Sequence, residues 1–134
     1  MTLSSVDLSQ AALEFLTERH LATLSTLRAD GTPHVVPVGF TWDATAGLVR
    51  VITNGSSTKA RNTRRGGYAA VSQVEGRRWI TLEGPATILD EPAAVREAER
   101  RYAERYRPPR ENPTRVVVAI AVGRVLCSRS LTAP

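Results

Sequence analysis

The segment NGSSTKARN, residues 54–62, gathers residue types that bind anions. It contains Lys59, the only lysine among the eighteen basic residues of the chain. The residues just before Lys59 are small and polar, and we predict a short helix over 58–65 that begins there. The first amides of a helix lack partners within it, and the helix dipole favours negative charge at that end. A phosphate or a carboxylate is therefore the group that this segment would bind.

The polar side chains of this segment allow two interpretations. They can act together as a phosphate cradle formed by Ser56, Ser57, Lys59 and Asn62. They can equally form an ordinary strand-to-helix turn with a serine cap and a solvated basic face. The run is not a P-loop, because that motif has a glycine directly before the lysine and Thr58 stands there. The residues alone leave these two interpretations evenly balanced.

Other catalytic groups are scarce. The two histidines, His20 and His34, have no Cys, His or Asp at metal-ligand spacing, so we predict no metal site and expect surface or satisfied histidines. No G-x-S-x-G segment is present, and the single cysteine, Cys127, falls in an apolar strand as an expected core residue. An enzyme with so few reactive side chains would take its reactivity from a cofactor.

Length, composition and charge bound the class of protein. The chain has 134 residues, enough for a single domain over 1–134, with 1–8 as a flexible N-terminal arm. Its net charge of +5 favours a phosphorylated cofactor, an acidic ligand or a nucleic acid as partner. One cysteine fits a reducing compartment, and no signal peptide or apolar run of membrane-spanning length is found. We therefore expect a cytoplasmic protein without a membrane partner.

The elements that position the anion-binding segment follow from the spacing of apolar and turn residues. Helices are predicted over 9–19, 58–65 and 91–107. Strands are predicted over 21–27, 34–42, 48–54, 68–75, 78–89 and 115–127. Pro37 predicts an edge position or a bulge for its strand, because proline has no amide proton to donate to a ladder. Successive hairpins and one long helix predict a mainly β, six-stranded antiparallel barrel, closed or nearly closed.

Four blocks of the sequence resemble a known family: FLTERHLATLSTLRADGTPHVVPVGF, RVITNGSSTKARN, SQVEGRRWITLEG and AERRYAERYRPPRENPTRVVV. Their combination is similar to the split-barrel flavin and deazaflavin oxidoreductases, which include pyridoxamine-phosphate-oxidase-like proteins. Within them it most resembles the actinobacterial deazaflavin-dependent group that contains biliverdin reductase. The resemblance implies a split β-barrel, a homodimer, and cofactor sites where the two subunits meet. It also implies coenzyme F-420, an 8-hydroxy-5-deazaflavin with a phosphate and an oligoglutamate tail, although some relatives use FMN.

The resemblance implies a set of cofactor-binding residues in the anion-binding segment. The residues that match the phosphate-binding turn of the family are Thr53, Ser56, Ser57, Lys59 and Asn62. On this basis the segment is expected to bind the phosphate of the cofactor.

A second set of expected site residues lies outside that segment. The backbone of Val36, Pro37 and Val38 matches the strand that contacts the edge of the cofactor ring. Trp79, with Arg78, matches a position that closes the site from the partner subunit. Both assignments rest on the resemblance alone.

The reaction implied is hydride transfer from reduced coenzyme F-420 to a conjugated, anionic small-molecule substrate, with the reduction of biliverdin to bilirubin as the leading expectation. No acidic residue stands out as a proton donor, so the catalytic residues stay unassigned. Arg78 and Arg129 are candidates for holding substrate carboxylates or for relaying a proton through water.

Two alternatives remain open. An FMN protein of the pyridoxamine-phosphate-oxidase type would use the same fold. The single lysine argues against it, since Arg50 falls on the strand face opposite Val51 and Thr53. A nucleic-acid-binding module would suit the positive charge. However, the sequence has no helix-turn-helix, zinc-finger or RNP motif, and only 5% of its residues are aromatic.

Overall fold

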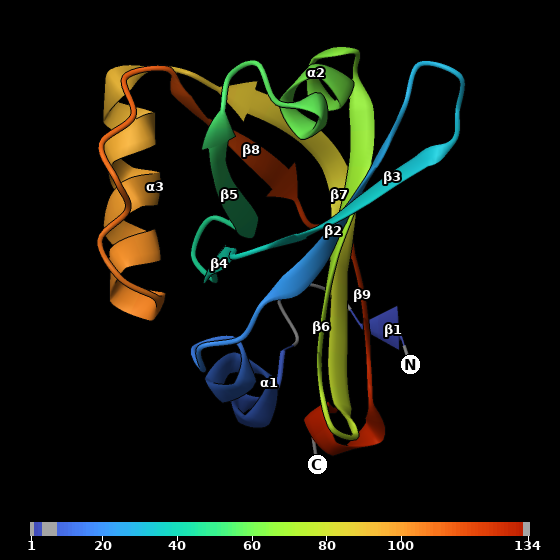
Figure 1. The fold of residues 1–134 in the computed structure, drawn as a ribbon. Coiled ribbons are helices and arrows are strands. Elements are labelled where there is room, and N and C mark those ends of the chain that lie inside the picture. The colour runs from blue at the N-terminus through green and yellow to red at the C-terminus, as the bar shows by residue number, and fades with distance from the viewer. Residues whose placement is uncertain (1, 4–7, 133–134) are drawn as a thin grey trace.

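The computed structural model describes residues 2–3 and 8–132, and one antiparallel sheet dominates it (Figure 1). Its nine described strands are β1 (Thr2–Leu3), β2 (Ala22–Leu27), β3 (Pro33–Val38), β4 (Thr41–Asp43), β5 (Leu48–Asn54), β6 (Gly67–Glu75), β7 (Arg78–Leu89), β8 (Arg115–Ala121) and β9 (Arg124–Cys127). The helices are α1 (Gln10–Phe15), α2 (Thr58–Arg64) and α3 (Pro92–Arg105), followed by the 3-10 helix η2 (Arg129–Leu131).

The sheet curls into a nearly closed barrel. Its strands follow the order β3-β2-β6-β7-β8-β5-β4, while β9 pairs with β7 and β1 pairs with β9. Every one of these pairings is antiparallel. β3 and β4 lie at opposite ends of this order, although only Gly39 and Phe40 separate them in the sequence. The two edges of the sheet are therefore joined by one stretch of chain, and the predicted mainly β, antiparallel barrel is confirmed.

The predicted strands are all present, and two of them are each divided in two. The strand predicted over 34–42 becomes β3 and β4, and the strand predicted over 115–127 becomes β8 and β9. Pro37 predicted either an edge position or a bulge, and the structure shows the edge position, because β3 is the first strand in the sheet order. The helices predicted over 9–19 and 91–107 are present but shorter at both ends, as α1 and α3.

The hydrophobic core fills the inside of the curled sheet. Alternate residues of β2 point inward, and Leu24 is fully buried among residues of β5, β6, β7 and β8. Phe15 of α1 belongs to this core, and α1 lies at the lower end of the sheet in Figure 1. From the predicted N-terminal arm, β1 pairs with β9, while residues 1 and 4–7 lie outside the described residues. None of the helices that the structure describes has the length and apolar composition needed to span a membrane.

The last turn of α3 is fastened to the barrel by Arg105. This arginine is 9% exposed, and none of the carboxylates in the described residues pairs with it. Its guanidinium donates to the carbonyl oxygens of Glu18 at 2.9 Å and Phe40 at 2.7 Å, and to the side-chain oxygen of Gln73. Gln73 is itself fully buried and donates to the carbonyl oxygen of Phe15 at 2.9 Å. Arg105 thereby ties α3 to the α1–β2 connection, to the β3–β4 junction and to β6.

Gly84 marks the position where β7 changes its pairing partner. Residues 80–83 pair with β9, and residues 86–89 pair with β8. A Cβ atom on Gly84 would lie 1.9 Å from the carbonyl oxygen of Ala121, at the end of β8. The chain that passes from β8 to β9 therefore touches the backbone of β7, and only glycine leaves room for it.

We predict that Gly84→Ala destabilises the fold by roughly 1–3 kcal/mol, because the added methyl group meets backbone atoms instead of a flexible side chain. Gly123→Ala is the matched control, since nothing lies within 4 Å of its Cβ position. Urea unfolding followed by circular dichroism measures both variants. Equal unfolding midpoints for the two would contradict the close contact at Gly84.

Candidate functional site

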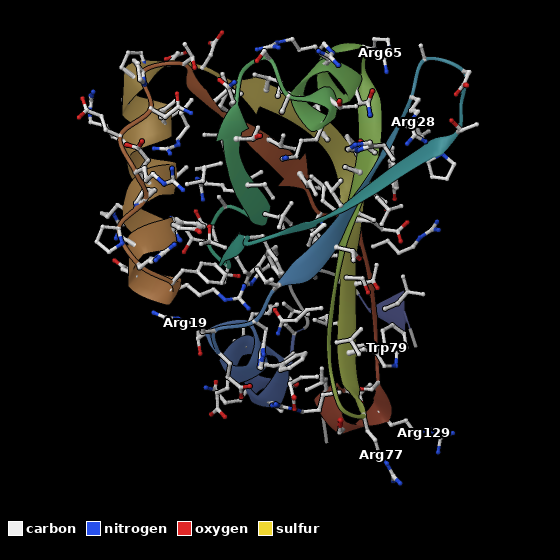
Figure 2. All side chains as sticks on the ribbon, viewed as in Figure 1. Arg19, Arg28, Arg65, Arg77, Trp79 and Arg129 are labelled. Atoms are coloured by element: carbon white, nitrogen blue, oxygen red, sulfur yellow. The ribbon has the colours of Figure 1, made fainter. Side chains whose placement is uncertain are left out.

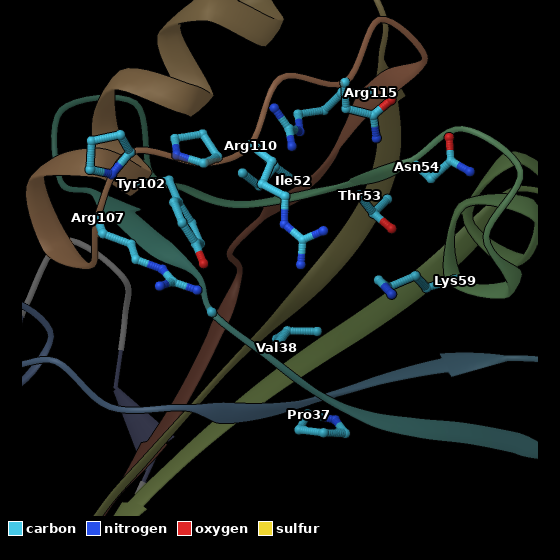
Figure 3. Close-up of a pocket in the computed structure, with 14 residues that line it drawn as sticks. Pro37, Val38, Ile52, Thr53, Asn54, Lys59, Tyr102, Arg107, Arg110 and Arg115 are labelled. Atoms are coloured by element: carbon cyan, nitrogen blue, oxygen red, sulfur yellow. The ribbon is translucent and has the colours of Figure 1, made fainter.

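A cleft of about 520 Å³ opens between α3, β5 and α2 (Figure 3). Its walls come from three distant parts of the chain. They are the end of β3, the end of β5 with the start of α2, and the connection from α3 to β8, which spans residues 106–114 and is called here the α3–β8 connection. The cleft has the size of a small-molecule binding site.

Positive charge sets the chemistry of this cleft. Its cationic side chains are Lys59, Arg107, Arg110 and Arg115, and no Asp or Glu of the described chain lines it. Arg115 is neutralised by Glu99 at 2.6 Å. No carboxylate in residues 2–3 and 8–132 pairs with the other three cations, and no metal-binding group of His, Cys, Asp and Glu is found there. The cleft therefore favours anionic ligands.

Lys59 lies on the first turn of α2 and points into the cleft (Figure 3). The hydroxyl of Ser57 caps this helix by accepting the amide of Ala60 at 3.2 Å, and it also accepts the hydroxyl of Thr53 at 3.0 Å. Lys59 is half-buried, and this burial lowers the pKa of its ammonium group. A partly desolvated cation without an acidic partner is a strong point of attraction for a phosphate.

Four of the predicted cofactor-binding residues line the cleft: Pro37, Val38, Thr53 and Lys59. The other predicted residues of this end of the molecule lie behind or beside it. Val36 packs against the hydrophobic core. Ser57 acts as the helix cap, and the exposed hydroxyl of Ser56 accepts the side-chain amide of Asn54 at 2.9 Å. The segment therefore forms both a serine-capped turn, through Ser57, and part of the cationic cleft, through Lys59.

Asn62 lies on the buried side of α2. Its side-chain amide donates to the hydroxyl of Thr26 at 3.0 Å, and its side-chain oxygen accepts from Arg65. These contacts hold α2 against β2, and Asn62 does not line the cleft. Its role in cofactor binding remains a prediction, and the structure shows that Asn62 also fastens α2 to β2.

The remaining predicted residues lie at the other end of the molecule. Trp79 and Arg129 are far below α2 in the view of Figure 2. Arg78 forms a bidentate pair with Glu18 at 3.0 and 2.9 Å, and its guanidinium lies 4.4 Å from the centre of the Phe15 ring. Within one chain, none of these three residues reaches the cleft.

The wall formed by α3 and the α3–β8 connection was missed by sequence reasoning. It contributes Tyr102, Arg107 and Arg110 to the cleft, beside Arg115 at the start of β8. The segment PPRENP, residues 108–113, is typical of a break between a helix and a strand, so Arg110 within it and Arg107 just before it attract no attention by pattern alone. The signal that could reveal them is the pairing of β8 with β5, which brings this connection beside the end of β5.

His34 also differs from its expected ordinary role. Its Nδ1 atom is buried and has no hydrogen-bond partner among the residues that the structure describes. Burial lowers the pKa of His34, and the charges of Arg28 and Lys59 lower it further. The imidazole therefore lies within the electrostatic reach of the cationic cleft.

Comparison with known proteins finds relatives that match nearly the whole chain. The family model described as pyridoxamine 5'-phosphate oxidase matches residues 8–127. A curated relative from Mycobacterium tuberculosis, the F-420H(2)-dependent biliverdin reductase, is 55% identical over 131 residues. The match covers 98% of this chain and 96% of the relative.

Solved structures share the fold. A conserved hypothetical protein from Mycobacterium tuberculosis is 26% identical with a TM-score of 0.73, covering 91% of this chain and 86% of that one. A structure described as an F-420 reductase is 24% identical with a TM-score of 0.67, covering 84% and 94%. The split barrel that the sequence led us to expect is thereby confirmed. Because the family model and the curated relative both span nearly the whole sequence, the chain belongs to the pyridoxamine 5'-phosphate oxidase family.

Proposed function

We propose that this protein is a cytoplasmic oxidoreductase that uses reduced coenzyme F-420 to reduce biliverdin to bilirubin. The observation that carries the proposal is the 55% identity to an F-420H(2)-dependent biliverdin reductase over 98% of the chain. The cleft agrees with it, because both the coenzyme and the substrate are anionic and the described lining carries cations without acids. An assay of the purified protein with the reduced coenzyme and biliverdin tests the proposal. If no bilirubin forms, the proposal is wrong.

The residues of the cleft fit such a coenzyme. Lys59 is positioned for a phosphate, since it is half-buried and has no acidic partner among the described residues. β3 pairs on one side only, with β2, so alternate amides and carbonyls near Val38 are available to the polar edge of a ring. Thr53 also lines the cleft. When bound, coenzyme F-420 supplies a hydride from its deazaflavin ring.

The chain itself contributes binding, orientation and charge. Tyr102 and Tyr106 pack on Gly39, where an added Cβ would lie 3.1 Å from their rings, and this contact fixes the end of β3 beside the cleft. A fixed wall holds two reactants in one relative orientation, which lowers the entropy cost of their reaction. Since no Asp or Glu in the described residues lines the cleft, we infer that water held by a cleft arginine delivers the proton.

The proposed enzyme is a homodimer. Large apolar side chains are exposed on the face formed by β2, β3 and β6: Leu27 (51%), Val35 (54%), Tyr68 (45%) and Val74 (63%). A second copy that covers them would gain the free energy of apolar burial. It would also allow Trp79, which is remote from the cleft of its own chain, to approach the cleft of the partner. Light scattering during gel filtration should give twice the 14.6 kDa chain mass, and a 14.6 kDa species at micromolar concentration would contradict the dimer.

FMN is the second candidate cofactor, because the matched family is that of pyridoxamine 5'-phosphate oxidase. Its phosphate would use the same Lys59. The two candidates are separated by thermal unfolding with each compound, since a ligand that binds only the folded state raises the melting temperature. We expect coenzyme F-420 to produce the larger increase.

We predict that Lys59→Ala weakens coenzyme F-420 binding by roughly 10- to 100-fold, because a hydrogen bond between charged groups in a partly desolvated site is lost. Fluorescence titration of the coenzyme measures the dissociation constant. The fold should be retained, since the Lys59 side chain makes no hydrogen bond or ion pair with the described residues.

Arg61→Ala is the matched control for Lys59→Ala. It removes one positive charge from the same helix, but Arg61 is exposed and bonds only to Ser56 and Thr58 nearby. If both variants bind the coenzyme as the wild type does, Lys59 is not a phosphate ligand. If both lose affinity equally, the effect is one of net charge alone.

We also predict that the bound coenzyme raises the pKa of His34. Burial is the main cause that holds the pKa of His34 below its usual range, and the positive charges of Arg28 and Lys59 lower it further. The negative charge of a phosphate beside Lys59 would offset these two positive charges. A ligand that raises a pKa binds better to the protonated protein, so affinity should increase as the pH falls through the titration of His34. NMR titration of the histidine ring measures this. The upward shift should disappear in Lys59→Ala, and its absence in the wild type would place the phosphate elsewhere.

A further inference from the structure

Arg107 and Arg110 are cations without an acidic partner among the described residues, and they lie on the wall of the cleft opposite Lys59. Both lie on the α3–β8 connection, and both are exposed. Figure 3 shows Arg107 on the α3 side of the cleft and Lys59 on the α2 side. Neither guanidinium forms a hydrogen bond or an ion pair with any described residue, Glu111 included.

The neighbouring arginines on this side of the molecule do have partners. Arg100 and Arg101 both pair with Glu97, at 2.9 and 2.8 Å. Arg115 pairs with Glu99 at 2.6 Å, at the back of the cleft. The acidic residues Glu97 and Glu99 of α3 thus form ion pairs with other arginines. The positive charge of Arg107 and Arg110 remains available at the cleft.

The α3–β8 connection is anchored at both ends, so the two arginines are held over the cleft. At its start, the hydroxyl of Tyr106 donates to the carbonyl oxygen of His20 at 2.7 Å. At its end, the side chain of Asn112 accepts from the amide of Thr114, whose hydroxyl donates to Asn54 at 2.6 Å.

Between the two arginines stand Pro108 and Pro109, whose rings fix two backbone dihedrals. A segment with so little backbone freedom loses little conformational entropy when a ligand binds. The two guanidiniums are therefore held on a stiff backbone, and each can donate two hydrogen bonds to a carboxylate in the bidentate geometry that arginine favours.

We propose that Arg107 and Arg110 form a carboxylate-binding subsite of the cleft, separate from the phosphate site at Lys59. This inference rests on the proposed function, in which two ligands carry carboxylates: biliverdin, through its propionates, and coenzyme F-420, through its glutamate tail. The subsite does not include Arg78 and Arg129, because Arg78 pairs with Glu18 and neither residue lines the cleft of its own chain.

The test compares Arg107→Ala, Arg110→Ala and the double variant with Arg96→Ala. Arg96 is an exposed residue of α3 that has no partner among the described residues and does not line the cleft, so its removal changes the charge without touching the subsite. Four ligands are titrated: biliverdin, its dimethyl ester, coenzyme F-420 and the same coenzyme without its glutamate tail. Dissociation constants are measured by fluorescence, at low and at high salt.

We expect the double variant to lose roughly 10- to 100-fold in affinity for a ligand that carries the carboxylates, and nothing for its counterpart without them. A loss for biliverdin but not its ester assigns the subsite to the substrate. A loss for the tailed coenzyme alone assigns it to the coenzyme. Unchanged affinity for all four ligands, relative to Arg96→Ala, would overturn the proposal.

The failure of the proposed function is distinguishable from the failure of the subsite. If the wild type neither binds coenzyme F-420 nor reduces biliverdin, the proposed function is wrong. An NMR titration with tri-γ-glutamate then decides the subsite alone. Shifts of the Nε–Hε signals that vanish on substitution of Arg107 and Arg110 support it, and unmoved signals reject it.

Discussion

The buried guanidinium of Arg105 is the interaction on which the geometry of the cleft depends. The acceptors of its hydrogen bonds are all neutral, and burial lowers its pKa. Taking a cation out of water is costly unless its hydrogen bonds are satisfied, and here three acceptors from three elements satisfy it. Its ring neighbours, Phe40 and Tyr106, lie 4.7 and 5.1 Å from the guanidinium carbon and add cation–π attraction.

The position of Arg105 in the chain explains its wider effect. Tyr106 follows it, and its hydroxyl accepts a hydrogen bond from the amide of Phe40 at 3.2 Å. Two successive residues therefore bind the junction between β3 and β4. Arg107 comes next and already belongs to the wall of the cleft. Residues 105–107 therefore both pack against the barrel and position the cationic wall of the cleft. A change in the conformation of the end of α3 would disturb both the packing and the position of that wall.

The sequence predicted what depends on local pattern. Hairpin turns and apolar alternation were enough for the antiparallel strands, and Pro37 limited its strand to an edge position or a bulge, of which the structure shows the edge. The breaks at Gly39 and near Gly123 were not predictable, since the tyrosine rings that pack on Gly39, Tyr102 and Tyr106, and the close contact of the β8–β9 junction with β7 are distant in sequence. The same limit applies to the site: helical spacing placed Asn62 beside Lys59, but it could not say which face of α2 would turn toward β2.

The proline at the edge of the sheet has a consequence for association as well as for binding. An edge strand with exposed apolar residues such as Val35 is a template on which another strand can add, and such additions lead to aggregation. Pro37 removes one donor from that edge and places a rigid ring where an incoming strand would need to pair. In the proposed enzyme, the border of the cleft would accept the flat ring of the cofactor, while Pro37 discourages a foreign β-strand from pairing there.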